Sequence, residues 1–307
     1  MESMESVAGK YDAGAGAPPA LDDEEGYLRW RGRKLSDYPS QVEDVRIEVA
    51  DFFSPTPAEH AAIAALCSRA NLAIAVWGRR PADDATQAAG VLALGASLGL
   101  TASEDQRSMQ ADGLVRIEEA DAGGRAGYIP YTNKPISWHT DGYYNYHGPA
   151  RGIQAMTLYC VRDAERGGLN GLLDPEIVYL RLRDEDPALV AALSREDAMT
   201  IPENAEDDGA LRPANVGPVF YRDPDGQLAM RYTARKRSIA WRDDAATRRA
   251  VAALERVCAT EPLVVRTTLR PGDALVCNNV LHDRGAFTSS PGARRLLYRV
   301  RYRGRIR

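Results

Sequence analysis

The residues best suited to chemistry lie in the stretch W-H-T-D-G-Y-Y-N, residues 138–145. His139 and Asp141 are two positions apart, so on a strand both side chains leave the same face. Among the other histidines, His282 has the best setting for a third ligand, because it follows an apolar run. Two histidines and a carboxylate on one face of an octahedral ion are the ligand set of non-haem Fe(II) oxygenases. The pattern therefore predicts a metal site built from His139, Asp141 and His282.

The H-x-D pair alone is a weak signal, because a surface histidine and aspartate at a turn would look the same. His60 falls in the first turn of an expected helix and is interpreted as solvated. His147 is assigned to a loop rather than to the metal. Tyr143 and Tyr144 follow the pair closely. For them, a core or lid position competes with a place in the wall of the substrate pocket, where a ring face could accept a cation.

A run of arginines near the end of the chain supplies a second group of candidates. Strand alternation puts Arg295 and Arg299 on one face and Arg294 on the other. A buried guanidinium needs an anion, because burying an unpaired charge is prohibitive. A dicarboxylic co-substrate would satisfy that need through a bidentate fork. The competing interpretation is a solvated basic edge strand, and we assign that role to the arginines from Arg301 onward.

The candidate residues are far apart in the sequence, so the fold has to bring distant segments together. Short runs of β-branched or apolar residues between Gly and Pro turns predict strands, and apolar residues with a helical period predict helices. The aromatic and basic segment 27–35 is expected to start a strand or hairpin, and the basic cluster 231–237 to lie on the solvated surface. Helices are expected at residues 55–70, 85–98, 174–183, 186–193 and 243–258, and strands at residues 72–77, 113–118, 128–132, 152–161, 219–221, 228–232, 263–268, 273–280 and 294–303.

Many short strands interrupted by a few helices predict a mainly β fold with flanking helices. The expected architecture is a double-stranded β-helix, that is, a jelly roll or cupin-like barrel with helices on its outside. Residues 1–22 contain few bulky apolar side chains and are expected to be a flexible segment. Residues 23–307 are expected to form a single catalytic domain, for which the chain is long enough.

The composition narrows the class of protein. The 307-residue chain has a net charge of −4, which argues against nucleic acid and anionic membrane surfaces as partners. Its four cysteines are scattered without a C-x-x-C motif and are expected to be reduced, buried thiols. No secretory leader and no apolar run long enough to span a bilayer is present. We therefore expect a cytoplasmic protein with a small-molecule partner, and the composition leaves a homo-oligomer open.

Four motifs, in this order, resemble the TauD/TfdA family of Fe(II)- and 2-oxoglutarate-dependent dioxygenases, which includes taurine dioxygenase and γ-butyrobetaine hydroxylase-like enzymes. They are W-H-T-D-G-Y-Y, G-G-L-N, L-H-D-R and R-R-L-L-Y-R. The resemblance covers residues 128–307. It implies that His139, Asp141 and His282 are the iron ligands and act in catalysis.

The resemblance also implies roles around the co-substrate. Arg295 matches the arginine that binds the far carboxylate of 2-oxoglutarate. Arg299 matches the arginine that holds the co-substrate or an anionic group of the substrate. Asn170 stands where the family usually has threonine, and an Asn amide can donate the bond of the missing hydroxyl. Tyr143 and Tyr144 are the candidate substrate contacts.

The implied activity is hydroxylation, or another oxidation, of a C–H bond in a small polar metabolite that is anionic or zwitterionic. Fe(II) would be the cofactor and 2-oxoglutarate and O2 the co-substrates, with release of succinate and CO2. Because Asp141 is present, no ligand position is left for the chloride of the family's halogenating relatives. The alternatives are a jelly-roll zinc hydrolase with the same three ligands, which has no use for buried arginines, and a non-catalytic metal-binding protein.

Overall fold

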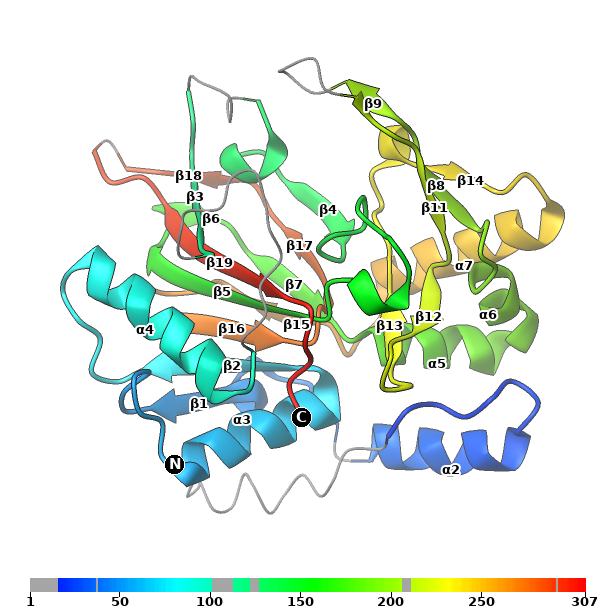
Figure 1. Cartoon of the computed structure of the whole chain (residues 1–307), viewed down its shortest axis with the longest axis horizontal. Helices are drawn as coiled ribbons and strands as arrows, with labels where there is room; N and C mark the ends of the chain where they lie inside the picture. Colours follow the sequence, from blue (N-terminus) through cyan, green and yellow to red (C-terminus); the bar gives the residue numbers. More distant parts are fainter. Residues whose placement is uncertain (1–15, 37, 101–112, 122–126, 206–210, 291) are drawn as a thin grey trace.

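The computed structural model describes residues 16–36, 38–100, 113–121, 127–205, 211–290 and 292–307 (Figure 1). Two sheets form its centre, one of six strands and one of four. Helices lie outside them, α3 and α4 on one side and α5, α6 and α7 on the other (Figure 1). In the described part of the chain, no helix is long and apolar enough to cross a membrane.

The larger sheet is mixed, with the order β1-β2-β16-β5-β19-β3. Only β1 and β2 run parallel; the other neighbours are antiparallel. Helices α3 and α4 pack on one face of this sheet through a core that includes Leu66, Leu94 and Tyr159. The strands are β1 (Arg46–Val49), β2 (Leu72–Trp77), β16 (Asp273–Cys277), β5 (Ala155–Arg162), β19 (Leu296–Tyr302) and β3 (Val115–Glu118), and the helices are α3 (Pro57–Ala70) and α4 (Asp84–Ser97).

The smaller sheet is antiparallel and carries the H-x-D motif at its edge. Its order is β15 (Val265–Thr267), β7 (Asn170–Leu173), β17 (Leu281–Arg284) and β4 (Ile136–His139). Leu172 and Val265 from this sheet share a buried core with Met156 and Leu297 from the larger sheet. The two sheets therefore pack face to face.

A third core joins the remaining helices to short strands. The helices are α2 (Glu24–Leu35), α5 (Pro175–Glu185), α6 (Pro187–Leu193) and α7 (Ala245–Thr260). The short strands of this core are β8 (Met199–Ile201), β12 (Phe220–Arg222), β13 (Leu228–Met230) and β14 (Ala240–Trp241). Elsewhere the structure has the short strands β6 (Arg166–Gly167), β9 (Asn204–Ala205), β10 (Leu211–Arg212), β11 (Asn215–Gly217) and β18 (Phe287–Thr288), and short 3-10 turns cover Val42–Val45, Ile129–Tyr131, Pro149–Arg151 and Lys236–Ser238.

The expected helices are all present within a few residues, and the expected strands at residues 219–221 and 228–232 appear as β12 and β13, which pair antiparallel. Two expectations are wrong. Residues 128–132 form a 3-10 turn rather than a strand. Residues 27–35 belong to helix α2, which begins after Asp23, whose side chain accepts a hydrogen bond from the Gly26 amide. Tyr27, Trp30 and Lys34 are its buried residues, and their spacing is that of one helix face.

Helix α2 is held by a buried lysine. Nζ of Lys34 lies 2.7 Å from Asp174 Oδ2 and 2.5 Å from Glu176 Oε2, and all three side chains are buried. Arg183 also donates to the carbonyls of Pro19 and Leu21, which belong to the part of the 1–22 segment that the structure describes. Removing either partner of such a buried pair is costly, so these contacts attach α2 firmly to α5.

Candidate metal centre

The three candidate ligands meet where β4 pairs with β17. His139 is the last residue of β4 and lies opposite His282 in the antiparallel register. Their imidazole centroids are 4.1 Å apart. With Asp141, two residues beyond the end of β4, they offer one ligand atom each within 4.8 Å of one another. Within the residues that the structure describes, no other group of three His, Cys, Asp or Glu side chains comes together in this way.

Backbone carbonyls orient both imidazoles. Nδ1 of His139 lies 2.9 Å from the Ser137 carbonyl, and Nδ1 of His282 lies 3.0 Å from the Val280 carbonyl. A carbonyl only accepts, so each Nδ1 carries the proton and each Nε2 keeps its lone pair for a metal. Burial lowers the pKa of His139 to about 3 and also lowers the pKa of His282. Both rings are therefore neutral at pH 7, which is the form that binds metals.

Asp141 is a buried carboxylate held by two arginines. Nη1 of Arg299 lies 3.3 Å from Oδ1, and Nη2 of Arg301 lies 3.1 Å from the same oxygen. Burial alone would raise the pKa of Asp141, but the two guanidiniums outweigh it and hold this pKa well below its usual range. Oδ2 is buried and accepts no hydrogen bond of good geometry from the described residues. The group is ionised, and one of its oxygens still has the capacity to bind a cation.

Asn279 holds the turn that carries Asp141. Its Oδ1 accepts from the Asp141 amide at 2.8 Å, and its Nδ2 donates to the carbonyls of Asp141 at 3.1 Å and Ile153 at 2.8 Å. Asn279 itself has a φ of 48°, in the left-handed region that asparagine enters more readily than most residues. All the polar atoms of this side chain thus serve to place the carboxylate turn against the start of β17.

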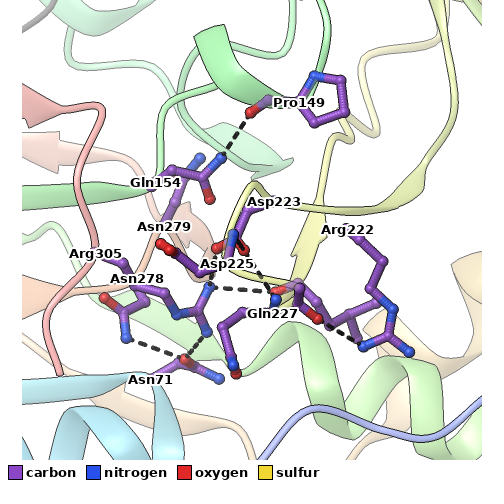
Figure 2. A network of polar contacts seen from close by, with 12 residues as sticks. Asn71, Pro149, Gln154, Arg222, Asp223, Asp225, Gln227, Asn278, Asn279 and Arg305 are labelled. Atoms are coloured by element: carbon purple, nitrogen blue, oxygen red, sulfur yellow. Dashed lines mark hydrogen bonds and ion pairs between the residues drawn. The ribbon is translucent and has the colours of Figure 1, made fainter.

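The neighbouring Asn278 belongs to a separate polar network (Figure 2). Its Nδ2 donates to Asn71 Oδ1 at 3.2 Å and to the Ile306 carbonyl at 3.2 Å, and Arg305 donates to the same Asn71 oxygen at 2.6 Å. Arg305 was expected to be solvated, but its side chain is only 9% exposed. The network explains the difference, because it pins the segment after β19 against the end of α3.

The paired arginines separate in burial as expected, although both precede the first residue of β19. Arg294 is exposed and forms an ion pair with Asp121. Arg295 is 5% exposed, and its guanidinium has no hydrogen-bond or ion-pair partner among the described residues. Gly168, in the G-G-L-N motif, comes close to it: a Cβ at that position would lie 3.8 Å from Arg295 Nε. A buried guanidinium without an anion is an incomplete site.

A second buried arginine, which the sequence analysis did not single out, lies beside Arg295. The guanidinium carbons of Arg284 and Arg295 are 4.7 Å and 5.0 Å from the centre of the Phe287 ring. Arg284 donates to the carbonyls of Thr132 and Lys134, at 2.7 Å and 2.6 Å. Burial, followed by the charge of Arg295, lowers the pKa of Arg284 to about 9. Two buried positive charges therefore lie close together here, and the negative charge of Glu119 acts on both of them.

Asn170 lies close to these charges, but its amide nitrogen is already used. Nδ2 donates to the Gly168 carbonyl at 3.1 Å and to the Thr267 carbonyl at 3.2 Å. The side chain is buried at the first residue of β7, opposite Arg284 in β17. The contact of this amide with a co-substrate therefore stays a prediction, and a bond donated by Nδ2 would have to replace one of these two.

Tyr143 and Tyr144 stand beside the ligands. The Tyr143 ring is edge-on to His139 with centroids 6.3 Å apart, and edge-on to Tyr144 at 5.3 Å. The hydroxyl of Tyr144 accepts from Arg301 Nη1 at 3.0 Å. A pocket next to Asp141 is lined by residues that include Tyr143, Tyr146 and Tyr221. Tyr143 thus lines this pocket, whereas Tyr144 packs against Tyr143 and contacts Arg301.

Besides Arg305, two further basic residues were wrongly assigned to the solvated surface. Arg301 is 3% exposed and forms an ion pair with Asp141. Arg231 is 2% exposed, and its guanidinium donates to the backbone carbonyls of Tyr143, Asn215 and others. Strand alternation from Arg299 would have found Arg301. No sequence pattern could have predicted that Arg231 is buried, because its partners are carbonyl groups that only the fold brings together.

The two remaining histidines lie outside the centre, as expected. His60 Nε2 lies 2.8 Å from the Ser97 carbonyl. The exposed His147 lies 2.7 Å from Asn145 Oδ1. Neither contributes to the group formed by His139, Asp141 and His282.

Two curated relatives share part of the sequence. A uridine-5'-phosphate dioxygenase from Streptomyces sp is 36% identical over 187 residues, which cover 58% of this chain and 65% of the relative. A uridine-5'-phosphate dioxygenase from Amycolatopsis sp is 35% identical over 178 residues, covering 54% and 60%. The chain therefore spans less than two thirds of the length of these relatives.

Solved structures share the fold at low identity. Asparagine oxygenase in complex with Fe(II), 2S,3S-3-hydroxyasparagine and succinate has a TM-score of 0.58 at 16% identity, and the match covers 97% of this chain and 89% of that one. The non-heme iron oxygenase OrfP in complex with Fe and alpha-ketoglutaric acid has a TM-score of 0.57 at 19% identity, covering 81% and 80%. The arrangement of mixed sheets and flanking helices is thus that of iron oxygenases.

The sequence matches the family described as taurine catabolism dioxygenase TauD, TfdA family, over residues 73–301. This span includes all three candidate ligands and the arginines at residues 295, 299 and 301. Because the match extends over more than half of the sequence, the chain belongs to the TauD/TfdA family of dioxygenases.

Proposed function

We propose that the protein is an Fe(II)- and 2-oxoglutarate-dependent dioxygenase that hydroxylates, or otherwise oxidises, a C–H bond of a small anionic metabolite. The observation that carries the proposal is the group of His139, Asp141 and His282, whose ligand atoms lie within 4.8 Å of one another. Two Nε2 lone pairs and one carboxylate oxygen suit a divalent iron and leave the opposite coordination positions open.

His139, Asp141 and His282 would hold the metal, which with 2-oxoglutarate and O2 supplies the oxidising chemistry. The protein's own contribution is orientation and a dry chamber. Carbonyl groups fix both imidazoles, Asn279 fixes the turn of Asp141, and Tyr143 packs edge-on against His139. Each of these contacts limits movement of a ligand and keeps water away from it.

Arg295 would bind the far carboxylate of 2-oxoglutarate. It is buried and has no partner among the described residues, and Arg284 adds a second positive charge next to it. A dicarboxylate would provide both a ligand for the metal and an anion for the arginine, since one carboxylate reaches the metal and the other the guanidinium. Asn170 and Arg299 complete the proposed co-substrate site. A zinc hydrolase with the same three ligands would leave Arg295 without an anion.

The charges of the chamber favour an anionic substrate. The charges of a ferrous ion and of a doubly charged co-substrate cancel, whereas the buried arginines 295, 299 and 301 outnumber the single carboxylate of Asp141. A positive excess in a buried site calls for a negative group on the substrate. The curated relatives are uridine-5'-phosphate dioxygenases, so uridine 5'-phosphate is the first substrate to test. Arg299, Tyr143 and Tyr144 are the proposed substrate contacts.

The proposal includes the finer architecture. The two face-to-face sheets would be the halves of a double-stranded β-helix, and residues 23–307 a single catalytic domain of a cytoplasmic enzyme. The support is the shared core between the sheets and the likeness to asparagine oxygenase over 97% of the chain.

Two measurements test the function. Anaerobic addition of Fe(II) and then 2-oxoglutarate should produce a weak visible charge-transfer band, which a zinc hydrolase would not show. Uridine 5'-phosphate should then increase the O2-dependent release of succinate. Absence of the band would refute the cofactor assignment. The band without stimulation by uridine 5'-phosphate would refute only that substrate.

A further inference from the structure

Arg301 makes the most extensive contact with the carboxylate of Asp141. Its Nη2 lies 3.1 Å from Oδ1, and its Nε lies 3.1 Å from Oδ2. Both oxygens of the carboxylate therefore lie within ion-pair distance of one planar guanidinium, although only the contact of Nη2 with Oδ1 has the geometry of a hydrogen bond. An arginine in this position restricts the orientation of a carboxylate as well as balancing its charge. Arg299 approaches from one side, with Nη1 3.3 Å from Oδ1.

Arg301 is itself fixed at both ends. Its backbone pairs with Met156 of β5, inside the larger sheet. Its Nη1 donates to the hydroxyl of Tyr144 at 3.0 Å. Tyr144 contacts Tyr143, and Tyr143 contacts His139. The contacts thus run from one candidate ligand, Asp141, through Arg301 and two tyrosines back to another, His139.

We propose that Arg301 is a positioning residue, which sets the orientation of Asp141 so that this carboxylate reaches the metal together with His139 and His282. This inference rests on the proposed function as far as the site holds a metal ion, and on no choice of substrate. Charge balance alone does not require Arg301, because Arg299 is also within ion-pair distance of Asp141. What Arg301 adds is the contact with both oxygens.

Three variants separate orientation from charge. Arg301→Lys keeps the positive charge but loses the planar fork, whereas Arg301→Met keeps much of the bulk and loses the charge. Arg303→Met is the matched control, because Arg303 is an exposed arginine two residues further along the chain. The readouts are the dissociation constant of Co(II), measured by calorimetry, and the visible spectrum of bound Co(II). Unfolding midpoints in EDTA report any loss of stability separately.

Both Arg301 variants should weaken Co(II) binding by about 10–100-fold, as partners of metal ligands generally do, and both should alter the Co(II) spectrum. Arg303→Met should leave both readouts unchanged. Tyr144→Phe, which removes only the distant contact of Arg301, should have a smaller effect in the same direction. A structural role alone would lower the unfolding midpoint of the Arg301 variants without changing the spectrum.

The proposal is overturned if Arg301→Lys binds Co(II) with the affinity and spectrum of the unaltered protein. It is also overturned if Arg301→Met binds Co(II) more tightly, because repulsion of the cation would then be the main effect of Arg301. Failure of the proposed function looks different. In that case the unaltered protein binds Co(II) and responds to the Arg301 variants, but it does not consume 2-oxoglutarate in the presence of Fe(II).

Discussion

The two ends of the candidate site differ in how their buried charges are balanced. At one end, Asp141 faces Arg299 and Arg301. At the other end, Arg295 and Arg284 lie on the Phe287 ring with no carboxylate of the described residues within ion-pair distance. The balanced end has the properties of a structural element, because its contacts are already made. The unbalanced end has the properties of a binding site, because it gains a partner only when an anion enters.

The largest effect should follow loss of a ligand at the balanced end. His139→Ala or His282→Ala removes one of three protein ligands, and two rarely hold Fe(II) on an open face, so metal binding and turnover should be lost. Calorimetric titration with Co(II) and assays of succinate release measure both. His147→Ala is the control, since His147 is exposed and lies outside the centre. Full turnover in either ligand variant would show that the centre has been misassigned.

The balance of charge itself can be broken with Asp141→Asn. This change leaves Arg299 and Arg301 buried against a neutral amide, which should cost about 3–5 kcal/mol of unfolding free energy in addition to the metal site. Urea unfolding in EDTA measures that loss. Asp121→Asn is the matched control, because Asp121 pairs with Arg294 at the surface, where an ion pair contributes about 0–1 kcal/mol. Equal losses for the two variants would contradict the comparison between the two ends.

At the unbalanced end, Arg295→Ala should weaken 2-oxoglutarate binding. A charge-assisted hydrogen bond contributes about 1.5–3 kcal/mol, which corresponds to about one to two orders of magnitude in affinity. The same variant should not lower stability in the absence of 2-oxoglutarate, because it removes a buried charge that lacks a partner. Arg294→Ala should change neither property. If Arg294→Ala weakens 2-oxoglutarate binding and Arg295→Ala does not, the assignment of the co-substrate site to Arg295 is wrong.

The smallest expected effect is a dependence of stability on pH. The folded protein lowers the pKa of His139 from the ordinary 6.5 to about 3, so between these values the unfolded chain binds a proton that the folded chain does not. Stability is therefore present above pH 6.5 and falls on acidification, by about 1.4 kcal/mol per pH unit for a fully shifted histidine. Urea unfolding at pH 7 and pH 5.5 measures this slope. The slope should be shallower in His139→Ala, and an unchanged slope would contradict the burial effect.

Much of the centre could be predicted from short-range pattern. The spacing of His139 and Asp141 and the different burial of Arg294 and Arg295 were both inferred from strand alternation, but in the structure Asp141 lies in the turn after β4 and both arginines precede β19. Alternation also places Arg301 on the same face of the strand as Arg299. The arginine-rich end of this strand was nevertheless interpreted as a solvated edge. In the structure β19 lies between β5 and β3. Strand order in a sheet is set by contacts between distant segments, so the burial of Arg301 was not visible in the sequence.

The prediction of a strand or hairpin at residues 27–35 was wrong for a related reason. Tyr27, Trp30 and Lys34 have helical spacing, but mixed aromatic and basic residues also suit a strand. The helix is stabilised by the burial of Lys34 against Asp174 and Glu176, about half the chain away. A lysine on the buried face of a helix is unfavourable until such partners are present. The helix could therefore be recognised with confidence only once its acidic partners were known.

The centre also has a consequence for the order of events during synthesis. Asp141 is tied to Asn279, and its charge is balanced by arginines of β19, 158 and 160 residues later in the chain. A ribosome adds roughly 5–20 residues per second, so the H-x-D turn waits for many seconds before its partners are translated. During that interval the nascent chain has no complete iron-binding site. Loading with metal is therefore expected to follow the emergence of β19, so the metal would reach segments that have already been synthesised rather than guide their first folding.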